Sequence, residues 1–414
     1  MTVTPLRPRA SAPRAASGAL RERTRVPGLD WVLMAAVALL LVLGTLLVWS
    51  ATATREALVG DDSTAYLRRQ LVNVAIGVVM MVVVVATDHR WLRILTPLVY
   101  LVSVIGLVLV LVMGSTINGS RSWIQLGGMS IQPAEFAKLS VVIGMALLVA
   151  ERTQGTWRRS IGTKEVVGLL AIAAVPAVLI LGQPDLGTML VLTATVLGVL
   201  AIAGAPRAWI VGLLVAGVAA ATVAVTAGVL KAYQVDRFMA FTNPDLDPRG
   251  AGYNVEQARI AIGNGGLFGQ GLFDGSQTRS GFVPEQQTDF IFTVAGEELG
   301  LVGAGVVVLL LCLVVWRALR IAAGSQDAFG RVAAGGIACW LGFQAFQNVG
   351  MCLGIMPVTG VPLPFVSYGG SSVFAVMLAV GVLQSIHLRN GLRGEDGAVA
   401  RYATAPRLAP AGRR

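Results

Sequence analysis

The sequence PEQQTDFIFTVAGEELGLVGAGVVVLLLCLVVW, residues 284–316, passes from polar into continuously apolar residues. It closes the long polar interval of the chain, residues 231–288, and places Asp289 where that interval enters the apolar run. About 20 apolar residues suffice to cross a bilayer as a helix, and an ionisable group at such a boundary is costly to hold near lipid. The stretch therefore predicts a transmembrane helix with a functional carboxylate at its entrance. The alternative is an acid that only stabilises the helix N-terminus.

The composition is that of an integral membrane protein. Hydrophobic residues make up 55% of the 414 residues and charged residues 13%, and the mean hydropathy is +0.73, outside the range of soluble domains. We predict an all-α, polytopic membrane protein of about ten transmembrane helices. The apolar stretches expected to form them are residues 31–50, 71–87, 93–113, 133–150, 166–182, 184–204, 208–230, 289–316, 329–354 and 363–386.

The net charge of +10 is concentrated partly at the two ends of the chain. Six arginines lie in the first 25 residues and six more follow residue 388. Basic tails beside apolar helices are typical of cytoplasmic ends that contact anionic lipids, and we do not expect nucleic-acid binding. Residues 1–27 and 390–414 are thus predicted to be disordered cytoplasmic tails, and residues 28–389 to form the membrane domain.

Short loops support this topology, because those rich in arginine and lysine fall on the side of the tails. The outer side receives the 114–132 loop and one large extracytoplasmic loop, residues 231–288, between the seventh and eighth helices. Both histidines, His89 and His387, fall on the cytoplasmic side. The three cysteines lack CxxC spacing and predict neither a zinc site nor a disulfide. Acid–base chemistry on the outer face must therefore use carboxylates.

The loop NGSRSWIQLGGMSIQPAEFAKLS, residues 118–140, leads into the fourth helix. It exposes Trp123 and Arg121 before that helix starts. Glu135 and Lys138 then lie three residues apart on one helix face, close enough to pair. Either they form a structural ion pair within the membrane, or they line a polar cavity.

Two further outer segments carry charges. QPDLGT, residues 183–188, places Asp185 at a helix start, where a capping role alone would explain it. Arg237 in the large loop is a cation able to hold a phosphate, although a solvated charge is the default explanation.

The glycine-rich run GNGGLFGQG, residues 263–271, does not match a nucleotide-binding loop, and its glycines instead suggest tight turns and close backbone approach. Glu297 and Glu298 are predicted to face the bundle interior.

Together these segments resemble the SEDS family of polytopic cell-wall polymerases. The motifs occur in family order over nearly the whole helical body: GSRSWIQLGGMSIQPAEFAKL, QPDLGT, DPRGAGYNVEQARIAIGNGGLFGQG, FVPEQQTDFIFTVAGEELGLVG and MPVTGVPLPFVSYGGSS. The sequence around AGYNVEQARIAIGNGG is more similar to the elongation branch, RodA, than to the division branch, FtsW.

The resemblance implies a peptidoglycan glycosyltransferase that acts on lipid II with a class B penicillin-binding protein as its crosslinking partner. The family's essential aspartate corresponds to Asp289, its loop tryptophan to Trp123, and its charged pair to Glu135 and Lys138. The matching motifs also contain Arg121, Asp185 and Glu285, which we include with Arg237 as candidate substrate contacts.

The expected mechanism makes Asp289 the general base that deprotonates the acceptor hydroxyl, with inversion at the donor carbon. A free aspartate, with a pKa near 3.9, is a weak base, so partial burial would have to raise its basicity. Arg121, Arg237 and Lys138 are the candidate contacts of the departing diphosphate. A divalent cation, Mg²⁺ or Mn²⁺, is expected to assist without a dedicated protein cage. The alternatives are a lipid-linked oligosaccharide flippase, a division polymerase, and a scaffold that recruits the transpeptidase.

Overall fold

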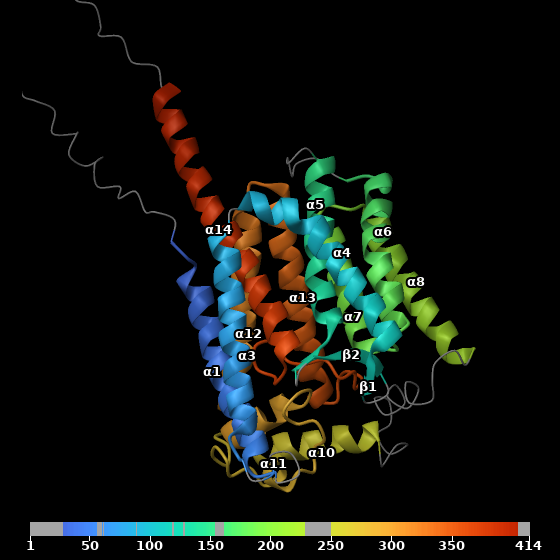
Figure 1. Ribbon diagram of the computed structural model, residues 1–414, viewed down its shortest axis with the longest axis vertical. Coiled ribbons are helices and arrows are strands. Elements are labelled where there is room, and N and C mark those ends of the chain that lie inside the picture. The colour runs from blue at the N-terminus through green and yellow to red at the C-terminus, as the bar shows by residue number, and fades with distance from the viewer. Residues whose placement is uncertain are drawn as a thin grey trace, which may run out of the picture.

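A computed structural model describes residues 28–55, 60, 62–87, 89–117, 120–126, 129–153, 161–227 and 250–404. Arg237 and the predicted tail 1–27 lie outside these residues. The structure is a helical bundle with a smaller cap of short elements at one end (Figure 1). The bundle helices are α1 (Trp31–Ala53), α3 (Ala65–Ala86), α4 (His89–Met113), α5 (Pro133–Arg152), α6 (Thr163–Leu181), α7 (Leu186–Ile202), α8 (Arg207–Thr226), α12 (Ile291–Gly324), α13 (Ala328–Cys352) and α14 (Gly370–Thr404).

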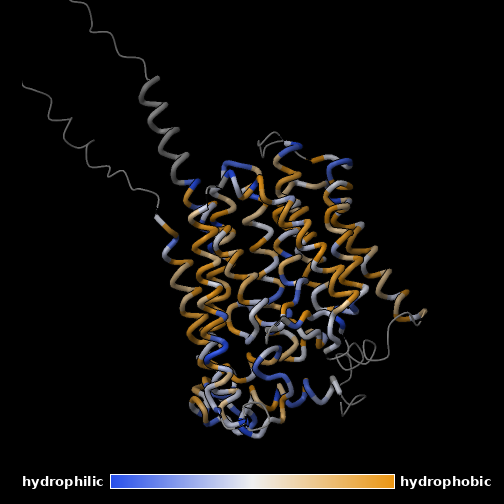
Figure 2. The backbone as a smooth tube through the Cα atoms, viewed as in Figure 1, coloured by the Kyte–Doolittle hydropathy of each residue, from blue (hydrophilic) through white to orange (hydrophobic). Residues whose placement is uncertain are grey.

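Each of the ten predicted apolar stretches falls mainly on one of these helices, although the stretch 363–386 begins in the turn before α14. Eight are long and apolar enough to cross a membrane, and apolar residues fill the middle of the bundle between more polar ends (Figure 2). The other two are α7, which has 17 residues, and α13, which buries three amide side chains, Gln344, Gln347 and Asn348. The protein is therefore a multi-pass membrane protein, and ten spans stay a prediction.

The C-terminal part of α14 differs from expectation. The sequence predicts a disordered tail from residue 390, whereas α14 continues to Thr404. The sequence GLRGEDGAVARYA contains several good helix formers, alanine, leucine, arginine and glutamate, which favour continuation of the preceding turn. Residues 405–414 lie outside the described part of the chain.

The centre of the bundle is α13, which contacts α5, α7 and α12, while α14 packs mainly against α3. Most of α13 is buried. By contrast, α8 has no buried residue among those described and stands at the edge of the bundle (Figure 1). The core thus lies around α5, α13 and α14.

The cap contains a small antiparallel sheet and two short helices. Strands β1 (Ser115–Ile117), β2 (Ser120–Leu126) and β3 (Met129–Ile131) are ordered β1-β2-β3. Helices α10 (Ala251–Asn264) and α11 (Ser276–Ser280) come from the predicted large loop. Helix α10 comes from a polar part of that loop. It lies across the end of the bundle (Figure 1).

A break in α12 joins the cap to the bundle. Gly300 has φ +66° and ψ −169°, a conformation open essentially only to glycine. The loop 265–271 enters the break: Gln270 and Gly271 donate their amides to the carbonyls of Glu297 and Glu298, both at 3.0 Å, and Leu301 donates to the Gly266 carbonyl at 2.9 Å. A Cβ on Gly269 would lie 2.1 Å from the Glu298 carbonyl oxygen. The prediction that these glycines allow close backbone approach is confirmed.

The sequence predicts that the two glutamates next to the break face the interior of the bundle; both are buried, but the Glu297 carboxylate faces the cap instead. The Glu297 carboxylate accepts hydrogen bonds from the Gln277 and Thr278 amides, at 2.7 and 2.9 Å, so it caps the start of α11. The Glu298 carboxylate accepts one from the Ser50 hydroxyl of α1 at 2.6 Å. These contacts hold the cap on α12.

Candidate active site

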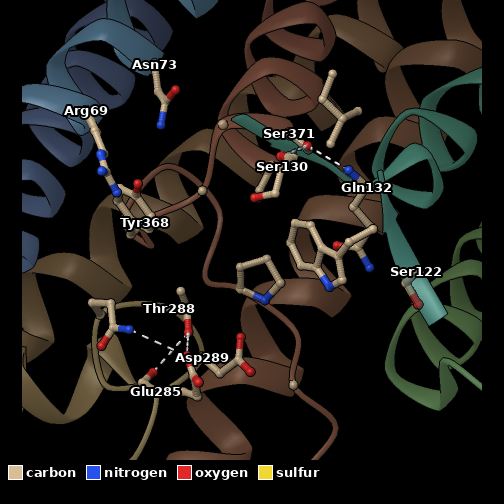
Figure 3. Close-up of a pocket in the computed structure, with 18 of the residues that line it drawn as sticks. Arg69, Asn73, Ser122, Ser130, Gln132, Glu285, Thr288, Asp289, Tyr368 and Ser371 are labelled. Carbon is tan, nitrogen blue, oxygen red and sulfur yellow. Dashed lines mark hydrogen bonds between the residues drawn. The ribbon is translucent and has the colours of Figure 1, made fainter. Parts of the chain in front are cut away.

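A cavity of about 910 Å³ opens where the bundle meets the cap. Its walls come from the start of α3, the small sheet, the start of α7, the segment before α12 and the turn before α14 (Figure 3). Four of the eight residues predicted from the sequence line it. They are Trp123, Asp185, Glu285 and Asp289.

Asp289 lies two residues before α12 and is half-buried. Its carbonyl accepts a hydrogen bond at 2.7 Å from the Asn348 amide group of α13, which also donates to Val361. Gly360, at φ +68°, lies against the carboxylate: a Cβ there would be 3.1 Å from Oδ2. The backbone of Asp289 is thus fixed by the core while its carboxylate lines the cavity.

The turn that precedes Asp289 is held on both sides. The Glu285 carbonyl accepts the amides of Thr288 and Asp289, both at 3.1 Å. Glu285 has φ +47°, an uncommon conformation for a non-glycine residue. From the turn before α14, Ser367 donates its hydroxyl to the Thr288 carbonyl at 2.6 Å, and Tyr368 donates its amide to Gln287 at 2.9 Å. A tightly held turn of this kind presets the direction of the Asp289 side chain.

Arg55, just after α1, supports the same turn from behind. It donates hydrogen bonds to the carbonyls of Thr278 and Val283 and to the side-chain oxygen of Gln286. Gln286 in turn donates to the hydroxyls of Thr278 and Thr293, both at 3.1 Å. Burial lowers the pKa of Arg55 from its usual value, and nearby Glu285 partly offsets this. Arg55 was not predicted as a functional residue, because its partners lie more than 200 residues away in the sequence.

Asp185 and Trp123 occupy the opposite wall. Asp185 caps α7, since its carboxylate accepts from the Thr188 amide at 3.0 Å, and it also accepts from the Gln132 side chain at 3.0 Å. The capping role is therefore confirmed, although the residue still faces the cavity. Trp123 comes from β2. Ser371, in the first turn of α14, accepts from the Gln132 amide at 2.9 Å and so ties the sheet to that helix.

Three predicted substrate contacts lie away from the cavity lining. Arg121 donates to the carbonyls of Val112 and Gly114, both at 2.8 Å, and so caps the end of α4. Glu135 and Lys138 pair at 2.6 Å and are almost fully buried, with Lys138 also donating to Gln344 at 2.7 Å. Because both point into the bundle, they join α5 to α13. The structural ion pair, rather than the cavity-lining one, is the arrangement found.

The sequence did not indicate the two arginines that form a cationic side of the cavity. Arg68 and Arg69 line it from the first turns of α3, together with Asn73. The apolar pattern placed this helix from residue 71, which left both arginines in a loop. Tyr368 faces them, with its ring 4.9 Å from that of Tyr66. Burial raises the pKa of Tyr368 above its usual value and Arg69 lowers it by less, so the phenol stays protonated at neutral pH.

The lining has four carboxylates, Asp62, Asp185, Glu285 and Asp289, against the two guanidinium groups of α3. Among the residues that the structure describes, no group of three or more histidine, cysteine, aspartate or glutamate side chains is arranged to hold a metal ion. The site therefore offers carboxylates on some walls and hydrogen-bond donors on another.

A family model for FtsW, RodA and SpoVE, described as cell cycle protein, matches residues 30–391. The chain belongs to this family. This is the SEDS family indicated by the sequence motifs, and the match spans the whole bundle, from the start of α1 into α14.

Curated relatives of similar length include a sporulation protein and two proteins named as peptidoglycan glycosyltransferases, one of them as a probable one. Stage V sporulation protein E of Bacillus subtilis is 37% identical over 359 residues, covering 86% of this chain and 96% of the relative. Peptidoglycan glycosyltransferase MrdB of Escherichia coli K12 is 38% identical, covering 87% and 93%. A probable peptidoglycan glycosyltransferase FtsW of Trichlorobacter lovleyi is 37% identical, covering 89% and 95%. These identities do not separate the branches.

Solved structures agree with the fold. RodA of Thermus thermophilus superposes with a TM-score of 0.63 at 30% identity, covering 87% of this chain and 97% of that one. A chain from a peptidoglycan synthase complex that coordinates polymerization and crosslinking superposes with a TM-score of 0.72 at 30% identity, covering 88% and 98%.

Proposed function

We propose that this protein, a peptidoglycan glycosyltransferase of the SEDS family, polymerises lipid II into glycan strands on the outer face of the cytoplasmic membrane. The observation that carries the proposal is the half-buried Asp289 carboxylate, held by its backbone at the rim of a 910 Å³ cavity. A cavity of this size at the end of a membrane bundle fits a lipid-linked sugar headgroup.

The reaction joins the 4-hydroxyl of the GlcNAc of one lipid II to the anomeric carbon of the MurNAc on the growing chain. Asp289 takes the hydroxyl proton as the C–O bond forms, and undecaprenyl diphosphate leaves from the opposite side, so α becomes β. Positioning by the fixed turn and partial removal from water both favour this role. Trp123, Asp185 and Glu285 are the other predicted residues in reach of the sugars.

A divalent cation, Mg²⁺ or Mn²⁺, fits as a partner of the substrate more than of the protein. Mg²⁺ is typically held by one or two carboxylates together with substrate phosphates, and Asp289 and Glu285 both line the cavity. When bound, it would offset the negative charge of the diphosphate. Polymerisation should stop on chelation and return on adding Mg²⁺; activity in thoroughly chelated protein would remove the cation from the proposal.

The proposed setting is an elongation complex with a class B penicillin-binding protein that crosslinks the new strands. The RodA-like sequence of the loop motifs and the structural likeness to a chain of a synthase complex support it. Both termini would be cytoplasmic, as the basic tails suggest. A division role is the alternative, and depletion of the protein distinguishes them: rounded cells indicate elongation, and filaments indicate division.

The test of the activity is polymerisation of labelled lipid II by the purified protein with its transpeptidase and Mg²⁺, with contaminating classical glycosyltransferases inhibited. Long glycan strands are expected. Lipid II translocation in proteoliposomes without any polymer would instead indicate a flippase.

A further inference from the structure

One wall of the cavity, built by α3 and the start of α14, presents hydrogen-bond donors away from Asp289 (Figure 3). We call it the α3–α14 wall and define it by Arg69, Asn73, Tyr368 and the first turn of α14, residues 370–372. All of these line the cavity.

The first turn of α14 leaves backbone amides free to meet a ligand. The first intrahelical bond runs from the Val373 amide to the Gly369 carbonyl at 3.1 Å, so the amides of residues 370–372 precede the helical ladder. Gly369, at φ +152°, has no side chain with which to cap them. Within the described chain, no side chain accepts from these three amides. A long helix with an open start of this kind attracts anions.

Asn73 supplies an independent sign of a ligand. It is 8% exposed and lines the cavity, and its Oδ1 would lie 3.2 Å from a Cβ on Gly370. In the part of the chain that the structure describes, no hydrogen bond joins its amide group, or the hydroxyl of the 7%-exposed residue Ser372, to another residue, and both residues open onto the cavity. Polar groups that face a cavity without a protein partner are free to bond to what enters it. A ligand with several acceptor oxygens would satisfy both.

Arg69 adds a positive charge one helical turn from Asn73, on the same face of α3. Its neighbour Arg68 is paired with Asp62. No carboxylate of the described residues lies within salt-bridge distance of Arg69; its guanidinium lies 5.9 Å from the Tyr66 ring and lowers the pKa of the Tyr368 phenol. Its guanidinium is therefore available for a bidentate contact with a phosphate group.

We propose that the α3–α14 wall is the binding site for the diphosphate of a polyprenyl-linked ligand. The inference rests on the proposed function for the nature of the ligand, and on the geometry for its place. The carboxylates on the other walls repel an anion, whereas this wall combines a cation, a helix start and unpartnered donors. The diphosphate is thereby directed to Arg69 and away from Arg121 and Lys138, which the sequence suggested.

The experiment measures binding without turnover. Undecaprenyl diphosphate and undecaprenol are titrated into the purified full-length protein in nanodiscs by thermophoresis. For Arg69→Gln we expect at least tenfold weaker binding of the diphosphate and unchanged binding of the alcohol. Asn73→Leu should weaken diphosphate binding several-fold. Arg259→Gln, which removes an exposed charge on α10 outside the cavity lining, should change neither. Unfolding temperatures verify that each variant is folded.

Competition by inorganic diphosphate, lost in Arg69→Gln, supports the diphosphate as the group recognised. Equal diphosphate affinity in folded Arg69→Gln and wild type overturns the site, even if lipid II polymerisation is observed. A fall in affinity in a protein that makes no polymer leaves the site standing and rejects the polymerase instead.

Discussion

Replacing Arg55 by alanine tests whether the turn that carries Asp289 has to be held from behind. Arg55 does not line the cavity, so the substitution leaves the substrate's direct contacts intact. It removes the donors of the Thr278 and Val283 carbonyls and of the Gln286 side chain. The turn would then be free to sample orientations in which the Asp289 carboxylate points away from the acceptor hydroxyl.

The magnitude follows from the contacts. Three acceptors at about 1 kcal/mol each give about 3 kcal/mol. The hydrogen bonds to the carbonyls are long, at 3.3 to 3.5 Å, so we expect the three contacts to contribute about half of this free energy. If that free energy holds the productive orientation, kcat falls by about tenfold, since 1.4 kcal/mol corresponds to a factor of ten. The KM for lipid II should change little.

Steady-state polymerisation of lipid II measures both constants. Arg55→Lys, which keeps the charge with fewer donors, should fall between wild type and Arg55→Ala. Arg279→Gln is the matched control, because its side chain is 57% exposed on the adjacent helix α11. A kcat within twofold of wild type for folded Arg55→Ala, or an equal loss in Arg279→Gln, would refute the positioning role.

Two further predictions concern stability and are read from thermal unfolding in detergent. Gly300→Ala should destabilise the protein by several kcal/mol, because a Cβ would lie 2.3 Å from the Gly269 nitrogen in a backbone conformation costly to other residues. A Cβ on Gly305, in the same helix, would meet no heavy atom within 4 Å, so Gly305→Ala should leave the stability unchanged or slightly higher. Equal destabilisation by the two substitutions would contradict the insertion of the 265–271 loop. Lys138→Met should cost about 3–5 kcal/mol by leaving Glu135 charged and buried without its partner. Adding Glu135→Leu should restore much of that stability; no recovery would mean that the pair is more than a structural bridge.

The sequence predicted the elements whose signals are local. Asp289 stands where a polar interval meets an apolar run, and the structure places it at the entrance of α12 and on the cavity. The cap of α7 by Asp185 follows equally from its position before a helix. Both depend on residues close together in the chain, which a pattern can show.

The misses arise from contacts between distant segments. Arg121 lies on β2 and Arg69 near the start of α3, and only the folded chain shows that Arg121 turns back onto α4 while Arg69 faces the cavity. The break at Gly300 is hidden within an apolar run, because its cause is the loop 265–271 inserted there. Side-chain direction at helix ends and long-range insertion are not encoded in hydrophobic periodicity.

The central claim is that Asp289 acts in chemistry and not in substrate binding, and Asp289→Asn tests it most directly. Polymerisation of labelled lipid II and the Kd for lipid II should be measured on the same preparations, with Asp274→Asn, whose side chain is 70% exposed, as the control. We expect at least about 100-fold slower polymerisation by Asp289→Asn, with a Kd within threefold of wild type and an active control. Polymerisation within tenfold of wild type, or a Kd that rises as much as the rate falls, would contradict it.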